Sequence, residues 1–405
     1  MNDEQQLYAR RDHGGKTLVV LTNIPTPYRA HFFECLSREL ASHSVRLTVA
    51  FCAASEWNRR WQYVETDHRY EHRILSGWSL KIGAITFHFN LGILEFLRQE
   101  RPNWLLSAGS WSMPTGVLAL LMRRRQKFIT IFWSEGHADA VLNPNGLVAW
   151  VRRFILKKYD AFAVPNIRTE DFLCKELGYR PACLRLPNTV DADYYVPATE
   201  TERCATRKRL LINTEDRVFL QVSQLEDRKG VCELLEAFSL LTVRHPRLKC
   251  VVVGTGTKEA ALRVRYAKEI ATGRLLLCGS LTADGVRDWL QAADFFILAS
   301  KLDPNPLSPI EAAFCGKPLI ISKLAGNSTD LIPDDTTGFI LTSISVEAIC
   351  ACALRLLELP KLCVDAMGKQ SRENALKKFS PSIAARDFAD QLMVSRPQER
   401  SHGSW

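Results

Sequence analysis

The stretch from Asp303 to Gly326 reads DPNPLSPIEAAFCGKPLIISKLAG and combines two acids, a helix start and a buried strand. Ser308, Pro309 and Glu311 form the pattern S-P-x-E, in which Ser308 is expected to cap a helix and Glu311 to complete a capping box. The glycine that follows ends the helix, and the apolar run PLII predicts a strand. A helix that opens from a strand end gathers free N–H groups and suits a phosphate. Glu311 could therefore close its capping box or hold ribose hydroxyls beside that phosphate.

Outward from this stretch, strand-like and helix-like segments alternate along both halves of the chain. The first half opens with a strand at 17–21, a helix at 30–40 and a strand at 45–51, which is how a doubly wound sheet begins. The loop between them, NIPTPYR, lacks the three glycines of a dinucleotide fingerprint, so a nicotinamide cofactor is disfavoured. The second half restarts the alternation, with strands expected at 218–222, 248–253, 274–278, 295–299 and 338–341. The sequence therefore predicts two α/β domains, each with a parallel sheet.

The segment Asp303 to Glu311, followed by EAAFCGKPLIIS, resembles the E-x7-E segment of the large nucleotide-sugar glycosyltransferase family 4. The resemblance implies the GT-B fold, in which two Rossmann-like doubly wound domains face a cleft. It also implies that Glu311 lies against the donor ribose and that Asp303, one methylene shorter than the family's glutamate, lies near the sugar ring. The family's Gly-aromatic-Gly is replaced here by Pro304-Asn305-Pro306, which predicts a stiffer loop.

The resemblance also gives the domain boundaries. Residues 186–191, LPNTVD, resemble the family's P-N-G-V-D turn, which ends the first domain. We expect a disordered N-terminus at 1–15 and an acceptor-side domain at 16–196. A nucleotide-sugar domain is expected at 197–379, and 380–405 is expected to form a helix that returns to the first domain, with a tail.

The donor site implied by the resemblance uses several segments of the second domain. Lys229 matches the lysine of the family's V-G-R-L-x-x-x-K-G block, whereas Gln224 occupies the family's arginine position and Arg228 could substitute for it. Glycines at strand ends let the backbone pass close to a nucleotide, although each is also an ordinary turn residue. The predicted donor-binding residues are Glu311, Leu307, Ser308, Asn305, Gly254, Gly256, Gly279 and Gln224, with Asp303, Lys229 and Arg228 expected to act on the reacting sugar and diphosphate.

The first domain offers candidates on the acceptor side. Tyr28 and Arg29 end a P-x-PYR segment that lines the cleft in many bacterial family members, and packing is the alternative role for both. Glu135 and His137 follow a predicted strand, at the edge where α/β folds present functional groups. Family members often carry a functional histidine after this strand. Either residue could take that catalytic place.

The expected activity is retaining transfer of a sugar from a nucleotide-diphosphate sugar to a glycan, lipid-linked or small-molecule acceptor, in bacterial polysaccharide or glycoconjugate biosynthesis. No metal or other cofactor is expected, because GT-B enzymes usually stabilise the leaving diphosphate with Lys, Arg and helix dipoles. Two rival functions share the fold and donor site: a sugar-nucleotide epimerase, and a non-catalytic nucleotide-sugar or glycan-binding protein. Gln224 and the Pro304-Asn305-Pro306 loop favour the second rival.

Composition sets the remaining expectations. The net charge is +9, yet no RNA- or DNA-binding motif accompanies it, so nucleic acid is not expected as a partner. Eight Lys or Arg residues against two acids lie within 123–158, beside the apolar runs VLALLM and LVAWV. That pattern fits either a helix on an anionic membrane surface or the solvated face of a core helix. Twelve scattered cysteines and a polar start without an apolar signal segment predict a cytoplasmic protein, peripheral at the inner membrane face if the first interpretation holds.

Overall fold

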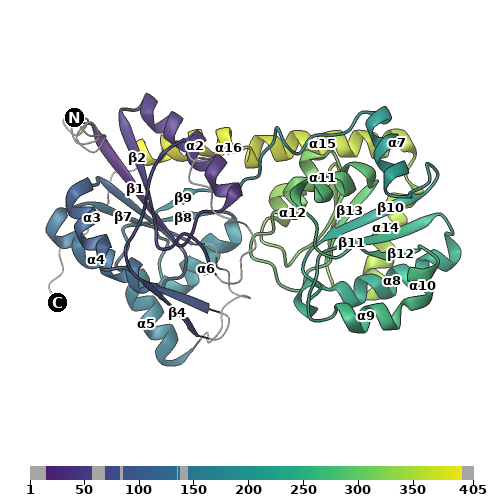
Figure 1. The fold of residues 1–405 in the computed structure, drawn as a ribbon, viewed down its shortest axis with the longest axis horizontal. Coiled ribbons are helices and arrows are strands. Elements are labelled where there is room, and N and C mark those ends of the chain that lie inside the picture. Colours follow the sequence, from purple (N-terminus) through teal and green to yellow (C-terminus); the bar gives the residue numbers. More distant parts are fainter. Residues whose placement is uncertain (1–14, 57–68, 83–84, 135, 137–144, 395–405) are drawn as a thin grey trace.

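The computed structural model describes residues 15–56, 69–82, 85–134, 136 and 145–394, which form two α/β domains side by side (Figure 1). Each domain has a parallel sheet with helices on both faces, as the alternation predicts. In the part of the chain that is described, no helix is both long enough and apolar enough to cross a membrane. Residues 1–14, within the N-terminus that was expected to be disordered, and residues 395–405 of the expected tail lie outside the described residues.

The first domain is built on a seven-stranded sheet in the order β3-β2-β1-β6-β7-β8-β9. Its apolar strands are buried on both faces, which is why they read as near-continuous hydrophobic runs. The strands are β1 (Lys16–Thr22), β2 (Val45–Phe51), β3 (Glu71–Ile74), β6 (Trp104–Ala108), β7 (Ile129–Trp133), β8 (Ala161–Val164) and β9 (Cys183–Arg185).

The helices of the first domain are α2 (Pro27–Ser42), α3 (Gly92–Glu100), α4 (Pro114–Gln126), α5 (Gly146–Leu156) and α6 (Ile167–Leu177). A separate antiparallel hairpin pairs β4 (Trp78–Ile82) with β5 (Ile85–Phe89). Within the segment 53–78, residues 71–74 form β3, which joins the main sheet parallel to β2. Trp57, Arg59, Arg60 and Trp61 of that segment lie outside the described residues.

The second domain has a six-stranded sheet in the order β12-β11-β10-β13-β14-β15. The strands are β10 (Arg217–Val222), β11 (Leu248–Val253), β12 (Leu275–Leu277), β13 (Phe295–Leu298), β14 (Leu319–Ser322) and β15 (Gly338–Leu341). The helices are α7 (Glu200–Arg209), α8 (Val231–Arg244), α9 (Glu259–Arg265), α10 (Ala267–Ala271), α11 (Ala283–Ala292), α12 (Ser308–Phe314), α13 (Ser328–Leu331), α14 (Val346–Glu358) and α15 (Lys361–Phe379).

Strand order reverses at one point in each sheet. In the first sheet, β2 lies on one side of β1 and β6 on the other. In the second sheet, β11 and β13 flank β10 in the same way. Ligands of open α/β sheets bind beyond the carboxyl ends of the strands at such a switch point. The topology therefore predicts two ligand sites, one above β1 and β6 and one above β10 and β13.

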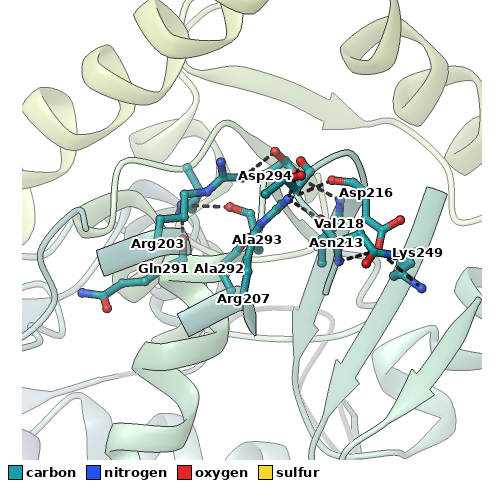
Figure 2. A network of polar contacts seen from close by, with 12 residues as sticks. Arg203, Arg207, Asn213, Asp216, Val218, Lys249, Gln291, Ala292, Ala293 and Asp294 are labelled. Atoms are coloured by element: carbon teal, nitrogen blue, oxygen red, sulfur yellow. Dashed lines mark hydrogen bonds and ion pairs between the residues drawn. The ribbon is translucent and has the colours of Figure 1, made fainter. Parts of the chain in front are cut away.

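A polar network fixes α7, which follows the inter-domain linker, to the second sheet (Figure 2). Arg207 is fully buried, and its guanidinium donates to the carbonyls of Ala292 and Asp216 at 2.9 and 3.1 Å and to the Asp294 carboxylate at 2.8 Å. Asp294 also accepts from Arg203 and from the backbone N–H of Val218, both at 2.8 Å. Each buried charge thus has several partners, which is what burying it requires.

The last helix, α16 (Pro381–Val394), crosses back and packs on α2 of the first domain (Figure 1). Phe388 and Leu392 enter the same apolar cluster as Phe32 and Leu36 of α2. The Gln391 amide accepts from the backbone N–H of Arg185 at 2.7 Å, and so covers part of the edge strand β9. The first domain is therefore completed by the end of the chain.

Candidate functional site

The strongest candidate site lies above β10 and β13, at the switch point of the second sheet. The turn after β10, a 3-10 helix at Asp227–Lys229, carries Lys229, and the loop after β13 carries Asp303. The Lys229 ammonium contacts Oδ2 of Asp303, and only 8% of each residue is exposed. Two residues 74 positions apart thus form a buried ion pair at the predicted place.

Two residues that the sequence reasoning did not select bring this pair together. Gly230 has φ 62°, and a Cβ there would lie 1.8 Å from the Ala299 carbonyl oxygen, so only glycine permits this approach. Gln221 is fully buried; its amide donates to Lys229 O at 3.3 Å and accepts from Ala299 N at 3.1 Å. The turn after β10 is thereby tied to the end of β13. In the sequence, Gly230 directly after D-R-K could have indicated this close approach of the turn to β13.

The electrostatics of the pair follow from its burial. Burial lowers the pKa of the Lys229 ammonium, and the Asp303 charge beside it opposes that effect. A buried ion pair adds little net stability, because desolvation offsets the attraction, but losing one partner is strongly destabilising. The Asp303 carboxylate therefore compensates the buried positive charge of Lys229.

Arg228 supplies a second cation beside Lys229. Its guanidinium donates to Oε1 of Gln224 at 2.7 Å, and the backbone carbonyl of Arg228 accepts from Lys301 N at 2.8 Å. Gln224 occupies the position at which the resemblance places an arginine, and here it holds the guanidinium of Arg228. Both side chains are exposed at the strand end, where a planar fork could bind phosphate oxygens.

The loop from Asp303 to Leu307 is fixed by both domains. Asn327 donates to the Pro306 carbonyl at 2.7 Å, and Asn166, the N-cap of α6 in the first domain, donates to the Pro304 carbonyl at 3.4 Å. Among the described residues, Nδ2 of Asn305 and Oγ of Ser300 are buried without a hydrogen-bond partner. Such groups are costly unless something satisfies them, so they are available to a polar ligand.

The predicted capping box at Ser308 is wrong. The N-cap of α12 is Leu307, which has near-helical dihedral angles (φ −85°, ψ −37°) and makes no side-chain cap. The helix therefore begins at Ser308, one residue earlier than the pattern implies, and Ser308 lies within its first turn. Glu311 is consequently free of the capping role.

Glu311 instead faces the linker between the domains. Burial raises the pKa of its carboxyl to about 7, and a side-chain hydrogen bond from Tyr195 partly offsets this shift. A carboxyl whose pKa is raised toward neutral pH is a candidate binding or catalytic group. Tyr195 was not selected from the sequence, because nothing local links it to a helix more than a hundred residues later.

The three predicted glycines differ in what surrounds them. Gly254 (φ 140°) would place a Cβ 2.0 Å from the Ser223 carbonyl oxygen, so glycine is required there by the chain's own packing. Gly256 likewise packs on the backbone of Leu225, whereas Gly279 has no other atom within 4 Å of its would-be Cβ. All three lie at the carboxyl ends of β11 and β12, on the same sheet edge as Lys229.

On the acceptor side, the structure places Arg29 at the switch point of the first sheet. Its guanidinium donates to Thr22 Oγ1 at 2.9 Å and lies 4.6 Å from the centre of the Trp133 ring. Thr22 ends β1 and Trp133 ends β7, so the arginine spans the carboxyl edge of that sheet. The side chain of Tyr28 and the whole of Glu135 and His137 lie outside the described residues.

Two Rossmann-like domains with parallel sheets, and basic residues at the switch point of the second sheet, are the architecture of a GT-B protein, and comparison with known proteins agrees. A model described as "Glycosyl transferases group 1" matches residues 202–374, and one described as "Glycosyltransferase Family 4" matches residues 31–194. The chain belongs to these family 4-type glycosyltransferases.

Similar proteins include a GDP-mannose-dependent monoacylated phosphatidylinositol monomannoside mannosyltransferase of Corynebacterium glutamicum, 29% identical over 228 residues. Another is the Escherichia coli UDP-Gal:α-D-GlcNAc-diphosphoundecaprenol galactosyltransferase, 25% identical over 235 residues. The alignments cover 55% and 57% of this chain and 58% and 59% of those relatives, so the chain spans a little over half the length of the curated relatives it matches. The fold matches that of Anabaena HepE, solved with UDP and glucose, with TM-score 0.70 at 14% identity over 93% of this chain and 99% of that one.

Proposed function

We propose that this protein transfers a sugar from a nucleotide-diphosphate sugar to an acceptor hydroxyl, with retention at the anomeric carbon. The observation that carries the proposal is the Lys229–Asp303 pair above β10 and β13, with Arg228 beside it, in a fold whose other switch point lies above β1 and β6. Fixed positive charge at this place suits a diphosphate leaving group. The switch point above β1 and β6, where Arg29 and Trp133 lie, is left for the acceptor.

In the proposed reaction, the bond between the anomeric carbon and the diphosphate oxygen breaks as the acceptor oxygen attacks from the same face. The acceptor proton passes to the departing phosphate oxygen, so no further base is needed. Lys229 and Arg228 stabilise the negative charge that develops on the diphosphate. Asp303 orients the Lys229 ammonium and lies near the sugar ring, and Glu311 accepts hydrogen bonds from the ribose.

The donor can be identified with a thermal-shift panel of UDP-, GDP- and ADP-sugars, because a ligand that binds the native state raises the melting temperature by mass action. The names of the relatives indicate GDP-mannose and UDP-galactose as donors, and HepE was solved with UDP, which supports this choice of panel. One nucleotide class should stabilise the wild-type protein, and Glu311→Ala should remove the shift. A panel without any stabilising nucleotide would refute the proposed donor.

Turnover assays then separate transfer from the two rival functions. Transfer requires product formation that depends on an acceptor, with slow donor hydrolysis in its absence. Conversion of a UDP-sugar to its epimer without an acceptor would identify an epimerase. Donor binding with neither transfer nor hydrolysis would identify a binding protein.

We further propose a lipid-linked acceptor at an anionic membrane surface, and helix α5 supports it. Leu147, Trp150 and Phe154 are 75%, 62% and 52% exposed on this helix, and Trp150 stacks on Phe154. Lys158 lies 4.6 Å from the Phe154 ring centre. Exposed apolar and aromatic side chains beside lysines are typical of a helix that lies at a membrane interface. Both relatives named above act on lipid-linked acceptors by their names.

The basic residues near α5 differ in whether the protein core holds them or their side chains are exposed. Arg123 is paired with Asp160, and Arg152 is buried against Glu176, so these two are held by the core. Arg125, Lys127, Lys157 and Lys158 are exposed. The charge that could meet a membrane therefore comes from fewer residues than the sequence alone indicated.

Vesicle co-sedimentation tests the membrane proposal. Binding to anionic vesicles should exceed binding to neutral ones, and salt should weaken it, because attraction to the surface fades beyond a Debye length of about 8 Å. Trp150→Ala with Phe154→Ala should reduce binding, whereas Leu362→Ala, at an even more exposed apolar residue of α15 in the other domain, should not. Equal recovery with neutral and anionic vesicles would favour a soluble acceptor.

A further inference from the structure

The loop that carries Asp303 is held through its backbone carbonyls. The Asp303 carbonyl accepts from the backbone N–H of Gly326 at 2.9 Å, and the Pro306 carbonyl accepts from Nδ2 of Asn327 at 2.7 Å. Both donors belong to the segment that follows β14, in the same domain. The second domain thus fixes this loop at two points, one on each side of Pro304.

The Pro304 carbonyl, between these two points, has a donor from the first domain. Nδ2 of Asn166 lies 3.4 Å from the Pro304 oxygen, and Asn166 is fully buried. A Cβ on Gly326 would lie 1.7 Å from the same oxygen and 2.9 Å from Nδ2 of Asn166, so only glycine lets these three groups meet. The first domain therefore reaches the middle of the loop through a buried amide.

The orientation of the Asn166 amide follows from its other partners. Asn166 is the N-cap of α6, and its Oδ1 accepts from the backbone N–H of Thr169 at 3.0 Å and from the Thr169 hydroxyl at 3.2 Å. A backbone N–H can only donate, so the amide oxygen faces Thr169 and the NH2 group faces the Pro304 carbonyl. The cap that starts α6 thus also determines which group meets the other domain.

The prolines make the placement of this loop matter for the ion pair. Pro304 directly follows Asp303, whose carboxylate contacts the Lys229 ammonium. Pro304 and Pro306 each have a fixed φ, so the loop has fewer dihedral angles with which to absorb a displaced peptide. A shift of the Pro304 carbonyl therefore moves the Asp303 side chain as well.

We propose that Asn166 is a positioning residue of the donor site: from the first domain, its amide fixes the Pro304 peptide and so holds the Asp303 carboxylate against the Lys229 ammonium. The inference rests on the proposed function, because it requires the Lys229–Asp303 pair to act on the sugar and the leaving diphosphate. A displacement of about 1 Å in such groups can cost about 100-fold in rate. The placement of the first domain thereby governs the geometry of reacting groups in the second.

Three variants separate this role from simple capping of α6. Asn166→Asp keeps the size and the capping oxygen but replaces the donating NH2 group by an oxygen that repels the Pro304 carbonyl. Asn166→Ser also keeps a good cap, brings no charge into the buried site, and is too short to reach Pro304. Thr169→Val is the matched control, because it removes one hydrogen bond to Asn166 but leaves the amide on Pro304.

Donor Kd, kcat for transfer and urea unfolding are measured for each variant of the whole chain. We expect Asn166→Asp and Asn166→Ser to lower kcat about 10- to 100-fold and to change donor Kd less than about threefold, because the groups that act in the transition state move while most donor contacts stay. Thr169→Val should keep the wild-type kcat. Loss of stability with a wild-type kcat in both Asn166 variants would overturn the inference and leave Asn166 as a helix cap.

A double variant tests whether Asn166 acts through the ion pair. In the Lys229→Arg background the pair is already altered, so Asn166→Ser should lower kcat by a smaller factor than in wild type; equal factors would overturn the proposed route. Lys229→Ala tells this inference apart from the proposed function. Its near wild-type transfer would refute the donor site itself, whereas its loss of transfer with a normal kcat in Asn166→Ser would refute only the role of Asn166.

Discussion

Burial raises the pKa of the Glu311 carboxyl to about 7. If the ionised form binds the donor, donor affinity should rise as pH increases through about 7. Isothermal titration at pH 5.5, 7 and 8.5 would measure this. The Glu311→Gln variant should bind weakly and equally at all three values. A wild-type affinity that stays flat with pH would mean that the ionisation of Glu311 does not matter for binding.

The same pKa predicts a pH-dependent stability in the absence of donor. The folded protein keeps the Glu311 proton up to about pH 7, whereas the unfolded chain releases it near 4.5. The free energy of unfolding should therefore fall as pH rises between these two values, since the folded state binds more protons. Urea unfolding of wild type and Glu311→Gln should show this slope only in wild type. Parallel pH profiles would contradict the predicted shift.

The Lys229–Asp303 pair allows folding and catalysis to be separated at the level of single residues. Lys229→Ala leaves the Asp303 carboxylate buried without its cation, so we expect a loss of about 3 kcal/mol of stability together with a loss of turnover. The double variant Lys229→Ala with Asp303→Ala removes the stranded charge. It should regain most of the stability, measured by urea unfolding, and none of the turnover.

Lys229→Arg adds a further comparison, because the charge is kept but the planar fork fills the site differently. It should recover only part of the activity. Near wild-type transfer by Lys229→Ala would contradict the assigned role of its charge on the leaving diphosphate.

Among single elements, α7 shows how a buried arginine fixes a helix. Arg207 and Arg209 lie on the same helix. Arg207 is buried against Asp294 and several carbonyls, whereas Arg209 is exposed to solvent and pairs with Asp288. Arg207→Met should cost about 3–5 kcal/mol, because it leaves Asp294 and the backbone carbonyls without their donor. Arg209→Met should cost less than about 1 kcal/mol. Urea unfolding of both variants makes the comparison; similar losses would show that burial is not the cause.

At the scale of the whole molecule, the first domain depends on the far end of the chain. Phe388 of α16 is fully buried in the core of the first domain, so Phe388→Ala should destabilise that domain by about 3–5 kcal/mol. The matched control is Arg386→Ala, whose side chain is mostly exposed on the same helix. Native-state hydrogen exchange should show the loss in β1 and β2 and little change in β10 and β11. A loss spread equally over both sheets would contradict the assignment of α16 to the first domain.

The sequence predicted most of the fold because each buried parallel strand and its helix leave a local pattern. The run at 218–222 was predicted as a strand and is part of β10, and the strand predicted at 248–253 is β11. Glu311 and Lys229 could be selected because motifs around them are compact in sequence. The start of α12 was predicted wrongly, since Leu307 adopts helical angles that S-P-x-E does not reveal.

What the sequence by itself determined was the succession of strands and helices, the two-domain α/β class and the family, since all of these depend on short-range patterns. The tertiary structure alone decided which distant groups meet. It paired Lys229 with Asp303 through the close approach at Gly230, and it held Arg152 in the core beside Glu176. Contacts across many tens of residues are set by sheet order and helix packing, and these depend on the burial of the whole apolar surface rather than on any single stretch.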